Sequence, residues 1–281
     1  MNDPEILKLA ALQIEPSVNL SDTFMQIEAL LSQALSEEES LDCVALPEYA
    51  FGTFREWATS KQESDQLIAR LQKGMGDLAK QHSVPIVAGS MPYQTKQNQW
   101  RNRCFVYSEE GKILGFYDKH HPFRAEKKLG LEPGTERPIF RIKHLRMAVL
   151  ICSDLWYHDL VSQIAPQIDF LIVPTMTTVL DDQYIRYGQW AWQSLVSIRS
   201  KEYTIPIASA DQASREYFPG VYTCGGSCIA DPSYRFSNEE GPLTQALKTA
   251  NDEKSQYITS TISLKAIREY ARYRREVGLR E

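Results

Sequence analysis

The feature that most constrains this chain is an alternation of short apolar runs, rich in β-branched residues, with longer segments of helical periodicity. The run at residues 8–14 precedes apolar residues at helical spacing over 24–35, for which Ser21 is the expected N-cap. The run at 43–46 precedes a helical pattern over 62–82. This alternation predicts parallel strand pairs that are covered by helices.

From residue 102 onward, hairpins replace this rhythm. Residues 102–108 and 113–119 predict a β-hairpin, and residues 138–142 and 146–151 predict a second strand pair beyond a polar loop. The other expected elements are strands at residues 85–90, 170–174, 205–210, 222–229 and 256–262, and helices after Trp156, at 182–201 and at 264–275. Parallel and antiparallel pairs together predict an α/β fold in which two mixed sheets pack face to face with helices outside.

The domain organisation expected from this pattern is simple. The chain has 281 residues, long enough to bury a large core, and it contains no internal repeat, low-complexity tract or Gly/Ser linker. We therefore expect a single domain over residues 1–281, in which residues 264–281 form a C-terminal helical tail.

Charge and cysteine content narrow the partners and the compartment. The net charge is -5, which gives no support to a nucleic-acid partner. Five cysteines make a poor disulfide framework, so reduced thiols in the cytoplasm are expected. The N-terminal segment lacks the pattern of a secretion signal, and no apolar stretch approaches the roughly 20 residues that span a bilayer. We expect neither a membrane nor a nucleic acid as a partner.

Three of the expected strands end in a reactive side chain. Glu48, Lys119 and Cys152 each follow directly on an apolar run. In α/β folds, ligands bind beyond the carboxyl ends of strands, so these three groups could converge on one cleft. Each residue also has an ordinary interpretation, as a loop carboxylate, a solvated ammonium or a small buried thiol.

The three side chains have complementary chemistry. A thiol attacks well only as a thiolate, which a nearby base or cation promotes. A carboxylate can take the thiol proton and later return it to a leaving amine. A lysine ammonium can stabilise the oxyanion that follows attack. The combination of a nucleophile, a base and a cation would suit nucleophilic catalysis by the thiol.

The sequence segments around these residues resemble those of the nitrilase superfamily of carbon–nitrogen hydrolases. The matching segments, in the family's order, are Leu-Pro-Glu-Tyr at residues 46–49 with Phe-Gly at 51–52, Tyr-Asp-Lys-His at 117–120 and Leu-Ile-Cys-Ser-Asp at 150–154. Weaker matches are Ala-Leu-Gln at 11–13, Glu-Pro-Gly at 132–134 and Gly-Gly-Ser at 225–227. The resemblance runs from about residue 7 to about residue 263.

This resemblance implies a four-layer α-β-β-α sandwich and a Glu-Lys-Cys triad. Glu48 would be the general base, Lys119 would stabilise the tetrahedral intermediate, and Cys152 would form a thioester. The backbone N–H of Ser153 would be a second oxyanion donor. Relatives also use a glutamate in the loop after the lysine, and Glu126 is its best match here, although a solvated loop charge is the alternative. Glu132 is better interpreted as a turn residue.

The chain departs from the family where the substrate is expected. Leu-Trp-Tyr at 155–157 stands where many relatives have Arg-Phe, and Glu202-Tyr203 stands where many have Glu-Asn. We expect Tyr49, Ser153 and Trp156 to border the substrate, but Trp156 and Tyr157 could equally be packing residues. The departures leave the reaction class in place but do not allow a substrate to be transferred.

The function expected from the resemblance is hydrolysis of a small linear amide or N-carbamoyl compound, without metal or organic cofactor. A nitrile hydrolase with the same triad, an acyltransferase and a catalytically silent binding or assembly subunit are the alternatives. Cys224 and Cys228 lack further ligands at zinc-site spacing, so no metal site is expected. By the same resemblance, the chain is expected to form a homodimer or a larger homo-oligomer.

Overall fold

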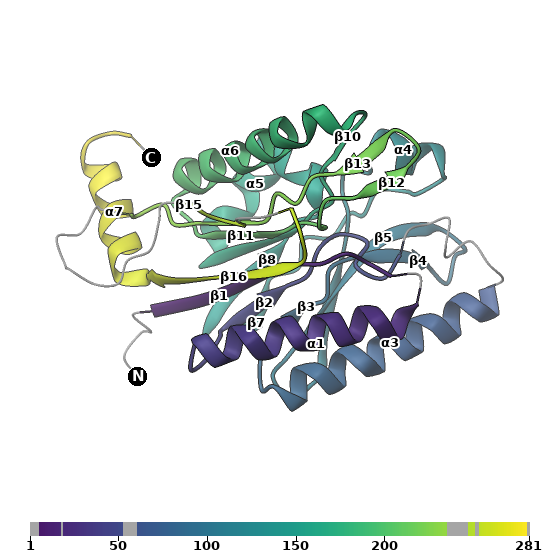
Figure 1. The fold of residues 1–281 in the computed structure, drawn as a ribbon. Coiled ribbons are helices and arrows are strands. Elements are labelled where there is room, and N and C mark those ends of the chain that lie inside the picture. Colours follow the sequence, from purple (N-terminus) through teal and green to yellow (C-terminus); the bar gives the residue numbers. More distant parts are fainter. Residues whose placement is uncertain (1–5, 18, 53–60, 235–246, 251–252, 280–281) are drawn as a thin grey trace.

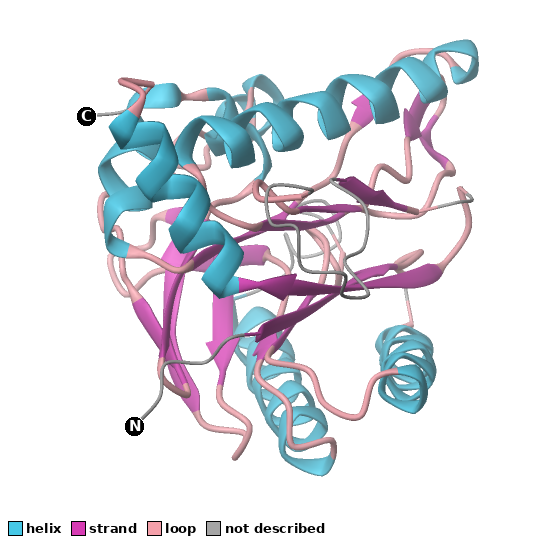
Figure 2. Ribbon diagram, turned by 90° about the vertical axis from the view of Figure 1, so that its left-hand side faces the viewer, coloured by secondary structure: helices cyan, strands magenta, loops and turns pink. Residues whose placement is uncertain are grey.

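A computed structural model of the chain describes residues 6–17, 19–52, 61–234, 247–250 and 253–279. Two mixed β-sheets lie face to face, and helices cover the outer face of each sheet (Figure 1). The view turned by 90° shows the same layers, with helices above and below the sheets (Figure 2). The predicted four-layer α-β-β-α sandwich is therefore confirmed.

The first sheet contains seven described strands. Their order is β16-β1-β2-β3-β5-β4, and β6 pairs with β5. The strands are β1 (Ile6–Gln13), β2 (Cys43–Ala45), β3 (Ile86–Val87), β4 (Met91–Gln94), β5 (Trp100–Tyr107), β6 (Ile113–Asp118) and β16 (Gln256–Ser263). Strands β1, β2 and β3 run parallel, and the hairpin of β5 and β6 is antiparallel as predicted. Helices α1 (Leu20–Glu37) and α3 (Lys61–Gln81) cover the outer face of this first sheet (Figure 1).

The second sheet contains six described strands in the order β15-β14-β11-β9-β8-β7. They are β7 (Phe140–Ile142), β8 (Leu145–Val149), β9 (Phe170–Pro174), β11 (Ile207–Ala210), β14 (Cys228–Ala230) and β15 (Leu247–Thr249). Strands β8, β9 and β11 run parallel. Helices α5 (His158–Ile164) and α6 (Ile185–Tyr203) lie on its outer face (Figure 1).

Short elements complete the described chain. Strands β10 (Thr178–Val179), β12 (Glu216–Phe218) and β13 (Val221–Thr223) form a small third sheet. The 3-10 helices are η1 (Cys152–Trp156), η2 (Ala165–Gln167) and η3 (Asp182–Tyr184), and the remaining helices are α4 (Arg124–Lys128) and α7 (Leu264–Glu276).

Apolar side chains from both sheets form one core between them. Leu9 and Val106 of the first sheet lie in the same cluster as Val149 and Ile172 of the second, and all four are buried. Burying such a side chain stabilises the fold by about 1.5–3 kcal/mol. A second cluster lies between the first sheet and its helices, where Leu31 and Leu71 are fully buried. The near-continuous apolar strands of the sequence are explained by this burial on both faces.

The structure corrects three local predictions. The run at 222–229 is two strands of different sheets, because Gly225 adopts φ 71° and turns the chain between them. Helix α1 is capped by Asn19, whose Oδ1 accepts from the Ser21 N–H at 3.1 Å. The expected polar loop after Lys119 contains helix α4.

The C-terminal helix α7 packs at one end of the sandwich rather than standing free. Its Arg274 Nη1 donates to Thr204 Oγ1 at 3.0 Å, directly after α6. Residues 280–281 of the expected tail and residues 1–5 of the N-terminal segment lie outside the described residues. None of the described helices is long and apolar enough to cross a bilayer.

Candidate active site

The three reactive side chains predicted at strand ends lie on both facing sheets. Glu48 follows β2 and Lys119 follows β6 in the first sheet, whereas Cys152 follows β8 in the second. The Glu48 N–H donates to the carbonyl of Thr175 at 3.1 Å, across to the chain that leaves β9. The carboxyl ends of strands from both sheets therefore meet at one edge of the sandwich.

A buried ammonium lies at the centre of this cluster. Lys119 Nζ lies 2.6 Å from Glu48 Oε1 and 2.7 Å from Glu126 Oε2, and the lysine side chain is 1 % exposed. Asn102 Nδ2 donates to Glu48 Oε1 at 2.8 Å and to Glu126 Oε1 at 2.7 Å. Both carboxylates are thus held by the same two donor groups, which fixes their positions relative to each other.

Glu126 is a member of this cluster and not a solvated loop charge. The residue is 6 % exposed and faces inward from α4. Besides Lys119 and Asn102, its carboxylate accepts from the Tyr49 hydroxyl at 2.6 Å and from the Phe123 N–H at 2.5 Å. Tyr49, predicted to border the substrate, is 8 % exposed. Its hydrogen bond to Glu126 joins it to the cluster.

Cys152 begins the 3-10 helix η1 in a sharp turn after β8. Its φ of 46° lies in the left-handed region, which costs an L residue about 1–3 kcal/mol and is typical of functional sites. The residue is partly exposed, and Glu48, Lys119 and the backbone of Met176 lie close enough to its thiol to shift the pKa of that group. The N–H groups in the first turn of a helix have no acceptor within it, which leaves the Ser153 N–H beside the thiol available.

The electrostatics of the cluster favour a neutral thiol and a proton acceptor next to it. Burial and the neighbouring Glu48 raise the pKa of Cys152 well above its usual range, and Lys119 offsets only part of this effect. Burial raises the pKa of Glu48 to about 7, with Lys119 lowering it and Glu126 raising it. Near neutral pH, Glu48 can therefore accept and return a proton.

Lys119 and Glu126, the other two ionisable groups of the cluster, remain charged. Burial disfavours the ammonium, but Glu48 and Glu126 outweigh it and raise the pKa of Lys119 well above its usual range. Burial likewise opposes ionisation of Glu126, yet Lys119, Tyr49 and the Phe123 N–H lower its pKa. Lys119 is thus a permanent cation beside the thiol.

The sequence interpretation missed Asp154, which joins the Cys152 turn to the Lys119 loop. Its fully buried carboxylate accepts from the Tyr117 hydroxyl at 2.8 Å, from the Ile151 N–H at 3.1 Å and from the His121 N–H at 2.7 Å. Asp154 was present in the matching segment at 150–154, two residues after the cysteine, but its contacts follow only from the fold. Asn102 was missed as well, since nothing in its strand distinguishes it.

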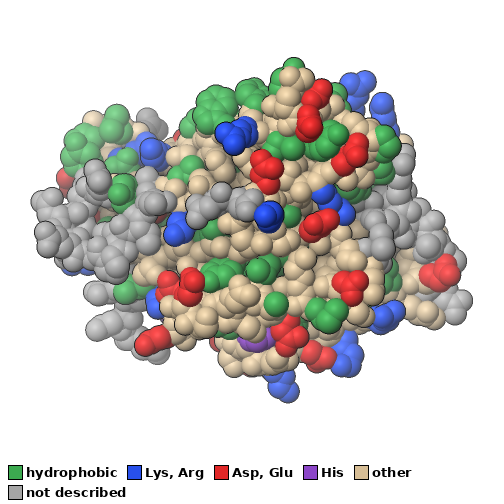
Figure 3. Space-filling model, in the orientation of Figure 1, with side chains coloured by type: hydrophobic (Ala, Val, Ile, Leu, Met, Phe, Trp, Pro, Cys, Tyr) green, Lys and Arg blue, Asp and Glu red, His purple; other side chains and the backbone are tan. Residues whose placement is uncertain are grey.

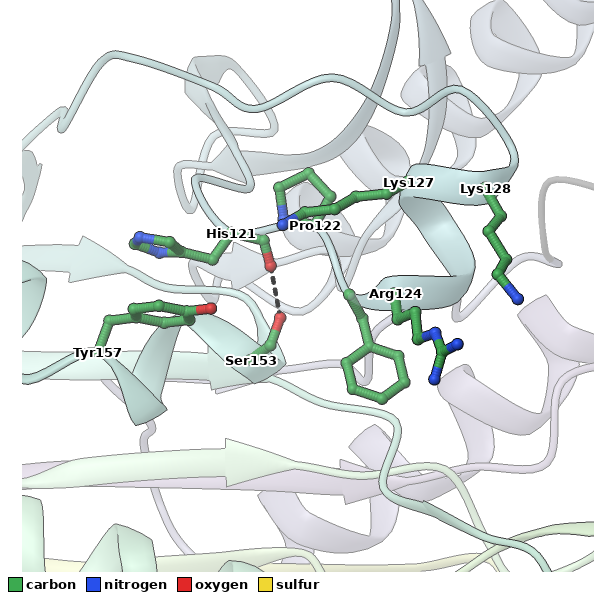
Figure 4. Close-up of a pocket in the computed structure, with 8 residues that line it drawn as sticks. His121, Pro122, Arg124, Lys127, Lys128, Ser153 and Tyr157 are labelled. Carbon is green, nitrogen blue, oxygen red and sulfur yellow. Dashed lines mark hydrogen bonds between the residues drawn. The ribbon is translucent and has the colours of Figure 1, made fainter.

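The side chains of the remaining predicted residues lie outside the buried cluster. Ser153 Oγ donates to the His121 carbonyl at 2.7 Å and lines an open depression next to the cluster (Figure 4). Trp156 is 56 % exposed, does not line that depression, and its carbonyl accepts from Arg199 Nη2 at 3.1 Å. Glu132 pairs with Arg101 at 3.2 Å, outside the cluster.

The two late cysteines form neither a disulfide nor a metal site. Cys224 and Cys228 are buried free thiols. Across the part of the chain that the structure describes, no group of three or more His, Cys, Asp or Glu side chains could hold a metal ion.

Comparisons with known proteins cover nearly the whole chain. A model of the carbon–nitrogen hydrolase family matches residues 8–272. A probable nitrilase from Schizosaccharomyces pombe is 25 % identical over 91 % of this chain and 88 % of that protein. An omega-amidase from Escherichia coli is 26 % identical over 82 % of this chain and 80 % of that protein. A carbon–nitrogen hydrolase from Helicobacter pylori superposes with a TM-score of 0.81 at 17 % identity, covering 99 % of this chain and 96 % of that one.

Proposed function

The chain belongs to the carbon–nitrogen hydrolase family, and we propose that it hydrolyses a small linear amide through a thioester on Cys152. The observation that carries this proposal is the buried contact of Lys119 with Glu48 at 2.6 Å, next to the Cys152 turn, whose thiol pKa both of these groups shift. A nucleophile, a proton acceptor and a fixed cation are the three groups that acyl transfer from an amide requires.

In the first half of the reaction, Glu48 takes the thiol proton as Cys152 Sγ attacks the amide carbon. The new S–C bond moves the carbonyl electron pair onto oxygen. The Lys119 ammonium and the Ser153 N–H stabilise that oxyanion. The C–N bond then breaks, Glu48 gives its proton to the leaving nitrogen, and the thioester remains.

In the second half, water replaces the amine. The water oxygen attacks the thioester carbon while Glu48 takes a proton from that water. The Lys119 ammonium and the Ser153 N–H stabilise the second oxyanion. The C–S bond breaks, the proton returns to the sulfur, and the acid leaves. Glu126 contacts no reacting atom in this scheme; it holds Lys119 charged and in place through the 2.7 Å contact.

The choice of amides over nitriles rests on the relatives. The protein from Escherichia coli is named as an omega-amidase, and another relative, from Bacillus subtilis, as a 2-oxoglutaramate amidase. The relative from Schizosaccharomyces pombe is named as a probable nitrilase, which favours nitrile hydrolysis as the second candidate. Ammonia release from matched amides, N-carbamoyl compounds and nitriles separates these classes: release from the nitrile but not from its amide would favour the second.

The proposal is tested at the nucleophile. In Cys152→Ala we expect amide hydrolysis to fall by about 10⁴-fold or more, because the covalent step is lost. The matched control is Cys224→Ala, which removes a second buried thiol that is not among the groups acting on Cys152 or Glu48, and it should leave turnover unchanged. Intact-mass and peptide analysis of the wild type with substrate should place an acyl adduct on Cys152. A fully active Cys152→Ala would end the proposal, and full inactivity of the wild type toward all three compound classes would support a silent assembly subunit.

We also propose that the chain forms a homodimer or a larger homo-oligomer through helix α6. Hydrophobic side chains gather along this helix on the surface (Figure 3), and Tyr187, Trp190 and Ile198 are 62 %, 63 % and 59 % exposed. Large exposed apolar patches mark association surfaces. Size-exclusion chromatography with light scattering that detects only the 32.1 kDa monomer would contradict this.

We propose the cytoplasm as the compartment of this protein, because its five cysteines are all free thiols. Fractionation of cells that express the tagged chain would test this: recovery in an oxidising compartment would contradict it.

A further inference from the structure

We propose that Gln212 is a positioning residue for the general base: its side-chain amide holds the Glu48 backbone, so that the Glu48 carboxyl stays within reach of the Cys152 thiol. This inference rests on the roles of Glu48 and Cys152 in the proposed function. Gln212 lies two residues beyond β11 in the second sheet and is fully buried. It was not predicted from the sequence, and its role follows from contacts between the two sheets.

The base and the nucleophile follow strands of different sheets. Glu48 follows β2 in the first sheet, whereas Cys152 follows β8 in the second (Figure 1). The distance between the two groups therefore depends on how the chain after β2 is tied to the second sheet. A displacement of about 1 Å between reacting groups can slow a reaction about 100-fold.

Both backbone polar groups of Glu48 are bonded to the second sheet. The Glu48 N–H donates to the carbonyl of Thr175, directly after β9, at 3.1 Å. The Glu48 carbonyl accepts from Gln212 Nε2 at 2.9 Å, and the Tyr49 carbonyl lies 3.3 Å from the same nitrogen. Tyr49 has a φ of 54°, in the strained left-handed region, which persists only when surrounding contacts hold it. Gln212 supplies part of that support from the opposite sheet.

The same amide contacts a second neighbour of the thiol. Gln212 Nε2 lies 3.4 Å from Met176 Sδ, and the Met176 backbone acts on the pKa of Cys152. Asp211 fixes Gln212 in turn, because its Oδ1 accepts from the Gln212 N–H and from the Thr177 N–H, both at 2.9 Å. Gln212 thus links the base to the chain beside the nucleophile through one anchored donor group.

The other end of the amide argues against a role in packing alone. Gln212 Oε1 is buried and has no hydrogen-bond partner within the described residues. An unpaired buried acceptor is destabilising, and an apolar side chain of the same size would avoid that cost. If the amide were reversed, Oε1 would face two carbonyl oxygens and repel them, so the donors define its orientation. The stabilising contacts of this amide are therefore those that Nε2 makes.

Gln212→Met removes the donor at nearly constant volume and tests this role in the whole protein. The first readout is alkylation of Cys152 by iodoacetamide, measured by peptide mass spectrometry, because alkylation requires the thiolate but no substrate. The alkylation rate should fall about tenfold, since a displaced Glu48 no longer takes the thiol proton. For amide hydrolysis, kcat should fall about 10- to 100-fold while KM stays within about twofold.

The pH profile separates positioning from a general loss of stability. Lys119, at 2.6 Å, lowers the pKa of Glu48, whereas Glu126 raises it. When Glu48 moves away from Lys119, its pKa rises, so the midpoint of alkylation and of kcat/KM in Gln212→Met should move above the wild-type value of about 7. A protein that is merely less stable keeps the wild-type midpoint.

The matched control is Gln189→Met. Gln189 Nε2 also approaches two successive carbonyls, those of Cys224 at 2.7 Å and Gly225 at 3.4 Å, but this turn carries no reacting group. Its alkylation rate, kcat and midpoint should equal those of the wild type. An unchanged rate and midpoint in folded Gln212→Met would overturn the proposal, as would an equal change in both variants.

Two further outcomes are also decisive. If Gln212→Met does not fold by circular dichroism, Gln212→Asn, whose amide is one methylene shorter, takes its place with the same expectation. Failure of both variants to fold would assign Gln212 to the fold and overturn the positioning role. If the wild type hydrolyses no amide, N-carbamoyl compound or nitrile, the proposed function fails separately, and alkylation still decides the role of Gln212.

Discussion

The inner side of α4 carries a buried, hydrogen-bonded carboxylate, whereas its outer side carries solvent-exposed cations. On the inner side, Glu126 is buried and accepts from four groups, Lys119 among them. On the outer side, Arg124, Lys127 and Lys128 are exposed and have no carboxylate partner in the described chain. A buried charge must be compensated, whereas a solvated one need not be. Inner-side substitutions should therefore affect both stability and chemistry, and outer-side substitutions should affect neither strongly.

The largest expected effect comes from removing the buried cation. Lys119→Met leaves Glu48 and Glu126 without their common counter-charge, which should cost about 3–5 kcal/mol of unfolding free energy. Amide turnover should fall by about 10³-fold, because an oxyanion donor is lost. The control Lys127→Met makes the same replacement on the outer side and should stay within about 0.5 kcal/mol of wild type in urea denaturation. Equal destabilisation of both variants would abolish the contrast.

The next effect concerns the charge of Glu126 and appears in the pH profile. Wild-type kcat/KM should rise with pH, with the midpoint of the rise at about pH 7, since Glu48 acts only when deprotonated. Burial is the largest cause of the raised pKa of Glu48, and the negative charge of Glu126 raises it further. In Glu126→Gln, this limb should therefore move to lower pH, and kcat should fall about 10- to 100-fold as Lys119 loses a charged partner.

The control for that profile is Glu132→Gln. Glu132 pairs with Arg101 at 3.2 Å, apart from the buried cluster, so its loss should leave the limb near pH 7. A limb that does not move in Glu126→Gln would show that Glu126 does not influence the titrating group.

A smaller effect is expected from Asp154, which joins the Cys152 turn to the Lys119 loop. In Asp154→Asn, an NH2 group replaces one of the two carboxylate oxygens. A buried N–H or the Tyr117 hydroxyl then loses its acceptor, which should lower the unfolding free energy by about 1–3 kcal/mol. Because the thiol shifts relative to Glu48, kcat should fall about tenfold with little change in KM. The control is the exposed Asp159→Asn, and a variant altered only in KM would assign Asp154 to substrate binding.

The smallest effect belongs to the outer side of α4. Arg124→Gln should change the unfolding free energy by less than about 0.5 kcal/mol, because the side chain is solvated. Amide turnover should stay within about twofold of the wild type. A destabilised Arg124→Gln would show that the outer side, too, contributes to folding.

Much of the fold followed from periodicity and turn chemistry. The apolar runs that end at Glu48, Lys119 and Cys152 are strands β2, β6 and β8, and the hairpin of β5 and β6 formed as predicted. Such patterns are local: a strand buried on both faces needs a continuous apolar run, and a tight turn needs particular residues. The run at 222–229 was misjudged because pairing with two different sheets leaves no local mark other than Gly225.

The residue types of the reaction centre are thus readable along the chain, but their environment is not. Glu48, Lys119 and Cys152 were identified from their positions after strands and from the sequence motifs around them. Three contacts could not be predicted from the sequence: Asn102 bridges two carboxylates, Tyr49 bonds to Glu126, and Asp154 holds the Cys152 turn. They join segments 24 to 77 residues apart. Burial and hydrogen bonding, which set the pKa of each group, arise only when distant segments pack together.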